Sequence, residues 1–305
     1  MSEPKAEVSL LRRTLTDEVF RVAGFSRRGL IRRLFGPILW PPANRVARII
    51  AEFDREVVSL GYRIATKNLL NRFVDEIHVL GNENIPKEGP LVVASNHPGT
   101  YDGLAIISSI PRDDMKVVVE GFPFFRSLPG SSPYLIHTPK DTSGRMGVLR
   151  SMIRHLEEGG GLLVFPSGKL DPDPEVLPGA MDALEEWSQS LGMILKKVPQ
   201  TQVLVTIVSG VLAQSCVDNP FARIFDEVWM KLRAAEFIQI VQQMLINRKF
   251  DLMPKVRFGD PISVDDLLNR FEVSGLTLEI IERARALMES HLDENLSLPG
   301  GVAIK

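Results

Sequence analysis

The sequence is poor in the residues that build disulfide frameworks and metal sites. It has one cysteine, Cys216, and five histidines among its 305 residues. A single cysteine cannot form an internal disulfide, and the chain contains neither a Cys-x-x-Cys pair nor a His-Glu-x-x-His helix. These absences argue against a disulfide-stabilised secreted fold and the common zinc sites, so we expect no metal and no bound cofactor.

Long apolar runs are also missing. No window approaches the roughly 18 consecutive apolar residues that a membrane-spanning helix needs. The first residues, MSEPKAEVSLLRR, are acidic and polar where a secretory signal would be basic and then apolar. The hydrophobic fraction of 44% and the charged fraction of 24% are ordinary for a folded protein. We therefore expect a cytoplasmic protein.

Acidic residues are absent between Val19 and Ala51, although the net charge of the chain is only −2. This stretch contains seven arginines, which alternate with large apolar residues: Arg21, Arg27, Arg28, Arg32, Arg33, Arg45 and Arg48. The mixture favours a helix on an anionic membrane surface, with the protein peripheral at the inner face of the membrane. The alternative is a solvated face packed on the rest of the protein. Nucleic acid is not expected as a partner, because no recognition motif accompanies the arginines.

The hydrophobic pattern divides the chain near residue 75. Residues 1–75 have helical periodicity, with a break at Trp40-Pro41-Pro42 and a second helix from about Asn44 to Arg72. Residues 76–305 alternate short apolar strands with helical stretches, and the expected strands cover 77–80, 91–94, 117–119, 162–165, 203–208 and 255–258. This alternation predicts an α/β fold with a largely parallel central sheet flanked by helices, preceded by a basic helical segment.

The first chemical motif follows the strand at 91–94 and reads NHPGTYDG. His97 comes at the end of this strand and Asp102 opens the next helix. A carboxylate one turn away can fix the tautomer and orientation of an imidazole, whose second nitrogen then acts as a general base. The alternative is that Asp102 only caps the helix and His97 only completes a turn.

The second motif follows the strand at 162–165 and reads FPSGKLDPDPE. Backbone amides around Ser167 and Gly168, with Lys169 beside them, suit a phosphate or a developing oxyanion. The sequence is not a P-loop, because Leu170 follows the Gly-Lys pair. We expect the acidic residues of the following proline-rich loop, among them Asp171 and Asp173, to form a solvated face.

Together, the His-x4-Asp element and the later FPSG strand end resemble the phospholipid and glycerol acyltransferase superfamily, whose first and third motifs are NHxxxxD and FPEGxR. The resemblance covers roughly residues 75 to 262 and includes GFPFFR at 121–126 and VRFGDPI at 256–262. The N-terminal helices and the PSGxxDPDP pattern are similar to the soluble glycerol-3-phosphate acyltransferases. The family glutamate of the third motif is Ser167 here, and the family arginine falls on Leu170.

The resemblance implies an acyltransferase fold and a direct transfer without an acyl-enzyme. The donor would be acyl-CoA or acyl carrier protein, and the acceptor a hydroxyl of a glycerol-phosphate or lysophospholipid-type molecule. His97 would be the base and Asp102 its orienting partner. Because the family arginines are missing, an acceptor phosphate would have to meet other residues: Lys140, Lys169, Arg126 and His137, beside Ser167 and Gly168.

Two other functions stay open. Ser167, His97 and Asp102 could form the triad of a serine hydrolase, although no GxSxG nucleophile elbow is present. A non-catalytic lipid-binding relative is the third possibility, because the third motif departs from the family pattern.

Overall fold

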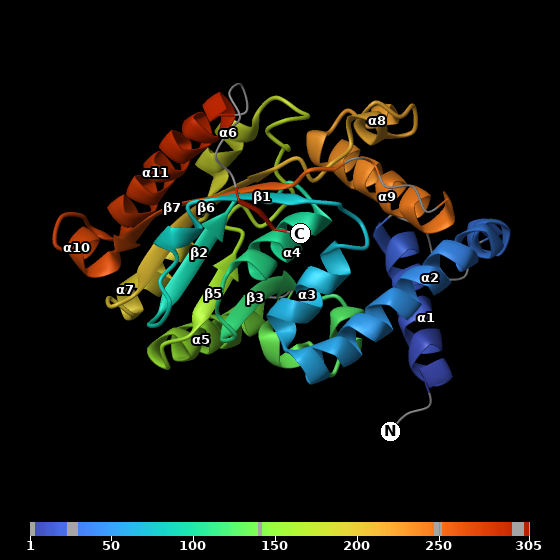
Figure 1. Ribbon diagram of the computed structural model, residues 1–305, viewed down its shortest axis with the longest axis horizontal. Helices are drawn as coiled ribbons and strands as arrows, with labels where there is room; N and C mark the ends of the chain where they lie inside the picture. The colour runs from blue at the N-terminus through green and yellow to red at the C-terminus, as the bar shows by residue number, and fades with distance from the viewer. Residues whose placement is uncertain are drawn as a thin grey trace.

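A single mixed sheet organises the molecule, as the computed structural model shows (Figure 1). The structure describes residues 4–22, 30–139, 142–246, 250, 252–294 and 302–304. Its strands are β1 (Ile77–Leu80), β2 (Leu91–Ser95), β3 (Met115–Glu120), β4 (Leu135–Thr138), β5 (Gly161–Val164), β6 (Gln202–Ser209), β7 (Lys255–Ser263) and β8 (Val302–Ile304). Its helices are α1 (Pro4–Val22), α2 (Leu30–Leu60), α3 (Tyr62–Leu70), α4 (Thr100–Ser109), α5 (Thr142–Glu157), α6 (Ala180–Ala183), α7 (Ser190–Lys197), α8 (Gln214–Val217), α9 (Val228–Ile246), α10 (Val264–Leu268) and α11 (Val273–Glu294).

The sheet is mostly parallel. The strand order is β4-β3-β5-β2-β6-β7-β1-β8. Strands β4, β3, β5, β2 and β6 pair in parallel, as do β7 and β1, whereas β6–β7 and β1–β8 are antiparallel. The predicted fold class is therefore confirmed. The sequence pattern did not reveal β4 and β8, which are short strands at the two edges.

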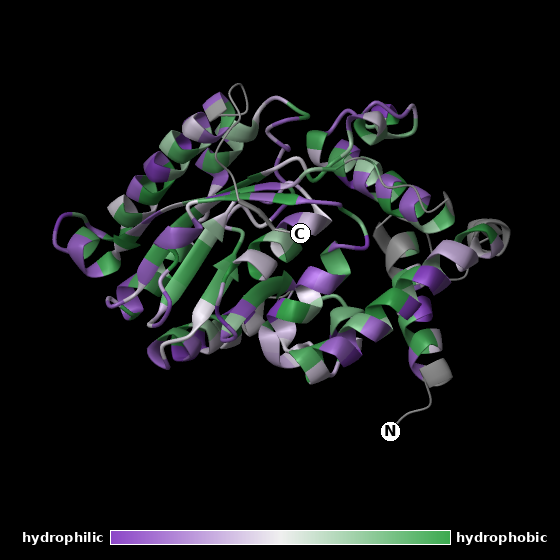
Figure 2. Cartoon of the chain, viewed as in Figure 1, coloured by the Kyte–Doolittle hydropathy of each residue, from purple (hydrophilic) through white to green (hydrophobic). Residues whose placement is uncertain are grey.

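Burial on both faces explains why the central strands are continuously apolar. Along β2, Leu91 and Val93 face one core, which includes α3 and α4. Val92 and Ala94 face the opposite core, where α5, α7 and α11 pack. In Figure 2 the hydrophobic strands lie between helices whose colouring alternates between apolar and polar faces. The sheet is thus the middle of three layers.

The N-terminal helices differ from the prediction at the prolines. α2 runs from Leu30 to Leu60 through Pro37, Pro41 and Pro42, so the predicted break at Trp40-Pro41-Pro42 is wrong. Each proline removes one N–H donor from the helix. The turns of α2 after these prolines pack against α1, where Ala47 and Ala51 lie in one buried cluster with Leu11. This burial offsets the loss of the hydrogen bonds. The helix ends instead at Gly61, whose φ of 86° starts α3 in a new direction.

The described helices include none that combines the length and the apolar character needed to cross a bilayer.

A buried carboxylate attaches α2 to the loop before β4. Asp54 is 3% exposed and accepts hydrogen bonds from the backbone N–H groups of Gly130 (3.0 Å) and Ser131 (2.7 Å) and from the Ser131 hydroxyl (2.7 Å). Buried polar groups that lose such a partner keep their full desolvation cost. Asp54 therefore links the helical segment to the sheet through satisfied polar groups.

We expect Asp54→Ala to lower the free energy of unfolding by about 2–4 kcal/mol, because three donors would lose their acceptor in a buried place. Urea titration followed by circular dichroism measures the change. Asp113→Ala is the matched control, because that side chain is 88% exposed, and its effect should stay within about 0.5 kcal/mol. Equal effects for the two variants would contradict the anchoring role.

Candidate active site

The side chain of Asn96, the first residue after β2, fixes the turn that follows the strand. The Asn96 side chain donates to the Val208 carbonyl of β6 and accepts from the Val208 N–H, both at 2.8 Å. It is 1% exposed. This two-way bond holds the chain against β6 immediately before His97.

His97 and Asp102 lie together, at the carboxyl end of β2 and in the first turn of α4. The His97 Nδ1 and Asp102 Oδ2 atoms are 2.8 Å apart. Asp102 also accepts from the N–H groups of Gly99 (3.0 Å) and Gly103. A carboxylate can only accept, so His97 carries its proton on Nδ1 and keeps the lone pair on Nε2. The arrangement is that of a general base held by its carboxylate.

The His97 ring is partly shielded from solvent. Its side chain is 28% exposed, while that of Asp102 is 1% exposed. The ring stacks on Phe165, which follows β5, with 4.2 Å between centroids. Burial lowers the pKa of His97, but the charge and hydrogen bond of Asp102, with further contributions from Glu236 and Asp171, outweigh it, so the net pKa is raised.

The loop after β5 is joined to the same histidine by its backbone. Asp171 accepts from the His97 N–H (2.8 Å), and its own N–H donates to the His97 carbonyl (2.8 Å). Asp171 is 2% exposed, and Asp173 is fully buried, so the predicted solvated face is wrong for both. Asp173 accepts from the N–H groups of Gly210 (3.0 Å) and Val211 (2.9 Å), just after β6. The two carboxylates thus tie the ends of β2, β5 and β6 together.

Ser167 and its neighbours are turned toward this loop. The Ser167 hydroxyl donates to the Asp171 carboxylate (3.2 Å) and to the Lys169 carbonyl (3.0 Å). Gly168 has a φ of 68°, and its N–H donates to the Phe165 carbonyl (3.0 Å). The Lys169 ammonium forms an ion pair with Glu186. An oxyanion role for the Gly168 amide would therefore require its turn bond to open.

The remaining predicted residues lie farther along the same edge of the sheet. Arg126 follows β3 and His137 belongs to β4, and β5 and β3 separate β4 from β2. Burial and the nearby Arg126 charge lower the pKa of His137. Neither ring nitrogen of His137 has a partner among the described residues. Lys140 lies outside the described residues. Arg126 and His137 thus form a separate pair rather than part of the His97 cluster.

Sequence reasoning missed three residues of α9, which cover the site from another side. Glu236 accepts from the Thr100 hydroxyl, Gln239 accepts from the Ala213 N–H (2.7 Å), and Gln243 accepts from the Tyr101 hydroxyl. Their spacing of three and four residues places all three on one face of the helix. Polar residues at this spacing on one face of a largely apolar helix were the signal available in the sequence.

The region that contains His97 and Asp102 matches a known protein family. Residues 76–204 match the family model described as Acyltransferase. This part of the chain, less than half of its length, is similar to that family. The match confirms the superfamily and the enzyme class predicted from the motifs. The matched range includes His97, Asp102 and Asp171 but ends before α9.

The chain is also similar to a solved structure, the 1-acyl-sn-glycerophosphate (LPA) acyltransferase PlsC from Thermotoga maritima. The similarity covers 95% of this chain and 98% of that chain, with 18% sequence identity and a TM-score of 0.46. No curated protein matches the chain.

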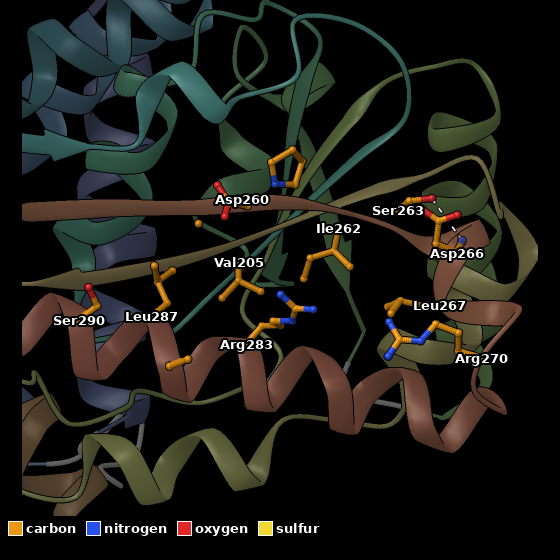
Figure 3. A pocket seen from close by; sticks show the side chains of 13 residues that line it. Val205, Asp260, Ile262, Ser263, Asp266, Leu267, Arg270, Arg283, Leu287 and Ser290 are labelled. Carbon is orange, nitrogen blue, oxygen red and sulfur yellow. Dashed lines mark hydrogen bonds between the residues drawn. The ribbon is translucent and has the colours of Figure 1, made fainter.

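A groove of about 420 Å³ lies between β7 and the helices α10 and α11. Figure 3 shows Asp260 on β7 and Arg283 and Ser290 along the facing helix. None of the residues that line the groove is one of the predicted site residues. The groove is therefore separate from the His97 cluster.

The buried Asp171 predicts a dependence of stability on pH. Burial raises its pKa from 3.8 to about 6, although the His97 N–H and Ser167 bonds and the His97 charge act in the opposite direction. The folded state then holds this proton more tightly than the unfolded state, so the contribution of Asp171 to stability falls as pH rises from about 4 to about 6.

Asp171→Asn removes this titration while keeping an oxygen that can accept from the His97 N–H. We expect the variant to lose less stability than the parent between pH 4 and pH 7, by up to about 3 kcal/mol. Urea unfolding at a series of pH values measures the difference. Parallel stability curves for the two proteins would show that Asp171 titrates normally.

Proposed function

We propose that this protein transfers a fatty acyl group from a thioester, acyl-CoA or acyl carrier protein, to a hydroxyl of a glycerolipid-type acceptor. Glycerol-phosphate and lysophospholipid-type molecules are the acceptors that the motif resemblance suggests. The observation that supports this proposal most directly is the 2.8 Å pair of His97 and Asp102 at the end of β2. The pair lies inside the region that matches the acyltransferase family.

In the proposed reaction, His97 Nε2 takes the proton of the acceptor hydroxyl as the oxygen attacks the thioester carbonyl. The carbon–sulfur bond of the tetrahedral intermediate then breaks, and the departing thiolate receives the proton from His97. Asp102 stabilises the imidazolium that exists between these two steps, and its bond to Nδ1 keeps Nε2 directed at the reacting oxygen. Backbone N–H groups around Ser167 are proposed to stabilise the oxyanion. The reaction needs no metal and no bound cofactor in this proposal.

The contacts of Ser167 favour direct transfer over a serine hydrolase. A serine nucleophile needs a hydrogen bond to its base. The Ser167 hydroxyl instead donates to Asp171 and to the Lys169 carbonyl. A non-catalytic lipid-binding relative is the other alternative, and it predicts no thioester turnover at all.

We expect His97→Ala and Asp102→Asn each to lower kcat by about 10²–10⁴-fold, because each removes part of the positioned general base. Release of free thiol from acyl-CoA, measured with and without a panel of glycerolipid acceptors, gives the rates. In the parent protein the rate should fall as pH drops below the raised pKa of His97. Asp102→Asn should move this limb to lower pH.

Circular dichroism serves as the folding control for both variants. Ser167→Ala should keep appreciable activity, since direct transfer needs no serine nucleophile. Near-normal turnover by folded His97→Ala would overturn the mechanism. Acceptor-independent thiol release together with an acyl-Ser167 adduct in mass spectrometry would favour the hydrolase.

The proposal includes attachment to an anionic membrane surface on the cytoplasmic side. Ile38 and Trp40 on α2 are 63% and 51% exposed. The Arg12 guanidinium lies over the Trp40 ring, 5.2 Å from its centroid. Arg48 is also exposed. The side chains of Arg21, Arg27, Arg28, Arg32 and Arg33 lie outside the described residues. Exposed apolar and cationic groups on one helix are the combination that binds lipid headgroups.

We expect the full-length protein to sediment with phosphatidylglycerol vesicles at low ionic strength and to dissociate at high salt. Replacing Arg27, Arg28, Arg32 and Arg33 by glutamine should weaken this binding about 100-fold or more, because each arginine near such a surface contributes on the order of 1 kcal/mol.

The matched control replaces four exposed cations elsewhere, Lys87, Arg150, Lys196 and Lys197, by glutamine. Equal loss of vesicle binding in the two sets would mean that net charge alone, and not this segment, causes the attachment.

A further inference from the structure

A third carboxylate lies beside the His97–Asp102 pair, and it comes from outside the region that matches the family. Glu236 of α9 accepts a hydrogen bond from the Thr100 hydroxyl. Its Oε1 atom is 3.5 Å from the position that a Cβ atom on Gly99 would occupy. Gly99 also donates its N–H to Asp102. The Glu236 carboxylate therefore lies directly over the turn that carries the base and its partner.

The polar face of α9 holds Glu236 in this position. Gln239 is 2% exposed and bonds both the Ala213 N–H (2.7 Å) and the Val211 carbonyl (3.0 Å) after β6. Gln243 is 5% exposed and accepts from the Tyr101 hydroxyl. With two turns of α9 attached to the edge of the sheet, Glu236 has little freedom to move away from Thr100.

The charged groups that raise the pKa of His97 are three carboxylates, those of Asp102, Glu236 and Asp171. Lys169, the nearest cation expected from the sequence, forms its ion pair with Glu186 instead. A phosphate beside the reacting hydroxyl would approach these carboxylates, two of which, Asp102 and Asp171, are buried, and like charges at short range repel.

We propose that Glu236 selects acceptors in which the group next to the reacting hydroxyl is an uncharged hydrogen-bond donor, such as a second hydroxyl, and disfavours those that carry a phosphate there. A neighbouring hydroxyl can donate to the Glu236 carboxylate, and this bond orients the acceptor with its reacting hydroxyl toward His97 Nε2. Glu236 is thus a specificity-determining residue. This inference rests on the proposed acyl transfer. Among its possible acceptors, it favours neutral glycerolipids over the glycerol-phosphate and lysophospholipid-type molecules that the motif resemblance suggests.

The test compares two acceptors that differ only in the phosphate, 1-oleoylglycerol and 1-oleoylglycerol 3-phosphate. The assays are run at pH 8.5, because burial raises the pKa of Glu236 above its ordinary value and a high pH favours the ionised carboxylate. We expect the parent enzyme to favour the neutral acceptor by about tenfold or more in kcat/KM. Glu236→Gln removes the charge but keeps an oxygen for the Thr100 hydroxyl, and it should reduce this preference about tenfold or more.

Three further variants separate charge from structure. Glu236→Asp keeps the charge and should keep the preference for the neutral acceptor. Thr100→Val removes the hydroxyl that bonds Glu236 and, whatever its overall rate, should leave the ratio between the two acceptors unchanged. Glu88→Gln removes an exposed carboxylate just before β2, at the opposite end of the strand from His97, and should change neither rate nor ratio.

The outcomes distinguish this inference from the proposed function. Transfer to both acceptors at similar kcat/KM, or an unchanged ratio in folded Glu236→Gln, would overturn the role of Glu236 while leaving acyl transfer in place. No acceptor-dependent thiol release by the parent enzyme with any acceptor would overturn the proposed function and the inference together.

Discussion

The pair of hydrogen bonds between the His97 backbone and Asp171 is the constraint on which the site depends. One runs from the His97 N–H to the Asp171 carboxylate and the other from the Asp171 N–H to the His97 carbonyl. They join the loops that follow two neighbouring parallel strands, β2 and β5. Since parallel strands end at the same edge of a sheet, these loops lie close together anyway. The two bonds turn this proximity into a fixed geometry, so that the direction of the His97 ring is set by two strands rather than by one flexible turn.

This fixed geometry has an electrostatic cost. Asp102, Asp171 and Glu236 all act on His97, and burial raises the pKa of both Asp171 and Glu236. Carboxylates in a water-poor place are costly unless protons or hydrogen-bond donors compensate them. Most of the compensation here comes from backbone N–H groups and from the hydroxyls of Thr100 and Ser167. The cluster therefore raises the basicity of His97 through carboxylates, which is useful for a base and unfavourable for an anion.

The parts of the fold that were predictable are those governed by local pattern. The central strands are buried on both faces, so they are continuously apolar and were recognised to within a few residues. The spacing of His97 and Asp102 was informative because both partners belong to one turn. The edge strand β4 was missed because four residues bounded by prolines carry little pattern. The continuous α2 was missed because the packing of Ala47 and Ala51 on α1, which compensates for its prolines, involves residues far away in the sequence.

Long-range contacts account for the rest of what the sequence did not reveal. Asp171 and Asp173 looked like a solvated loop because their partners, the backbone groups of His97 and of 210–212, become neighbours only when the sheet forms. Lys169 looked like a phosphate ligand because its distant partner, Glu186, could not be recognised from spacing.

Helix α9 is another element whose long-range contacts could not be read from the sequence. Its polar face contacts the site through Glu236, Gln239 and Gln243, while the Met244 carbonyl near its end accepts from Arg45 of α2 at 3.0 Å. One helix therefore contacts both the turn that carries His97 and Asp102 and the basic helical segment. A lipid acceptor bound at a membrane surface by that segment would meet α9 on its way to His97, so the residue best placed to distinguish acceptors lies on the element that joins the two regions.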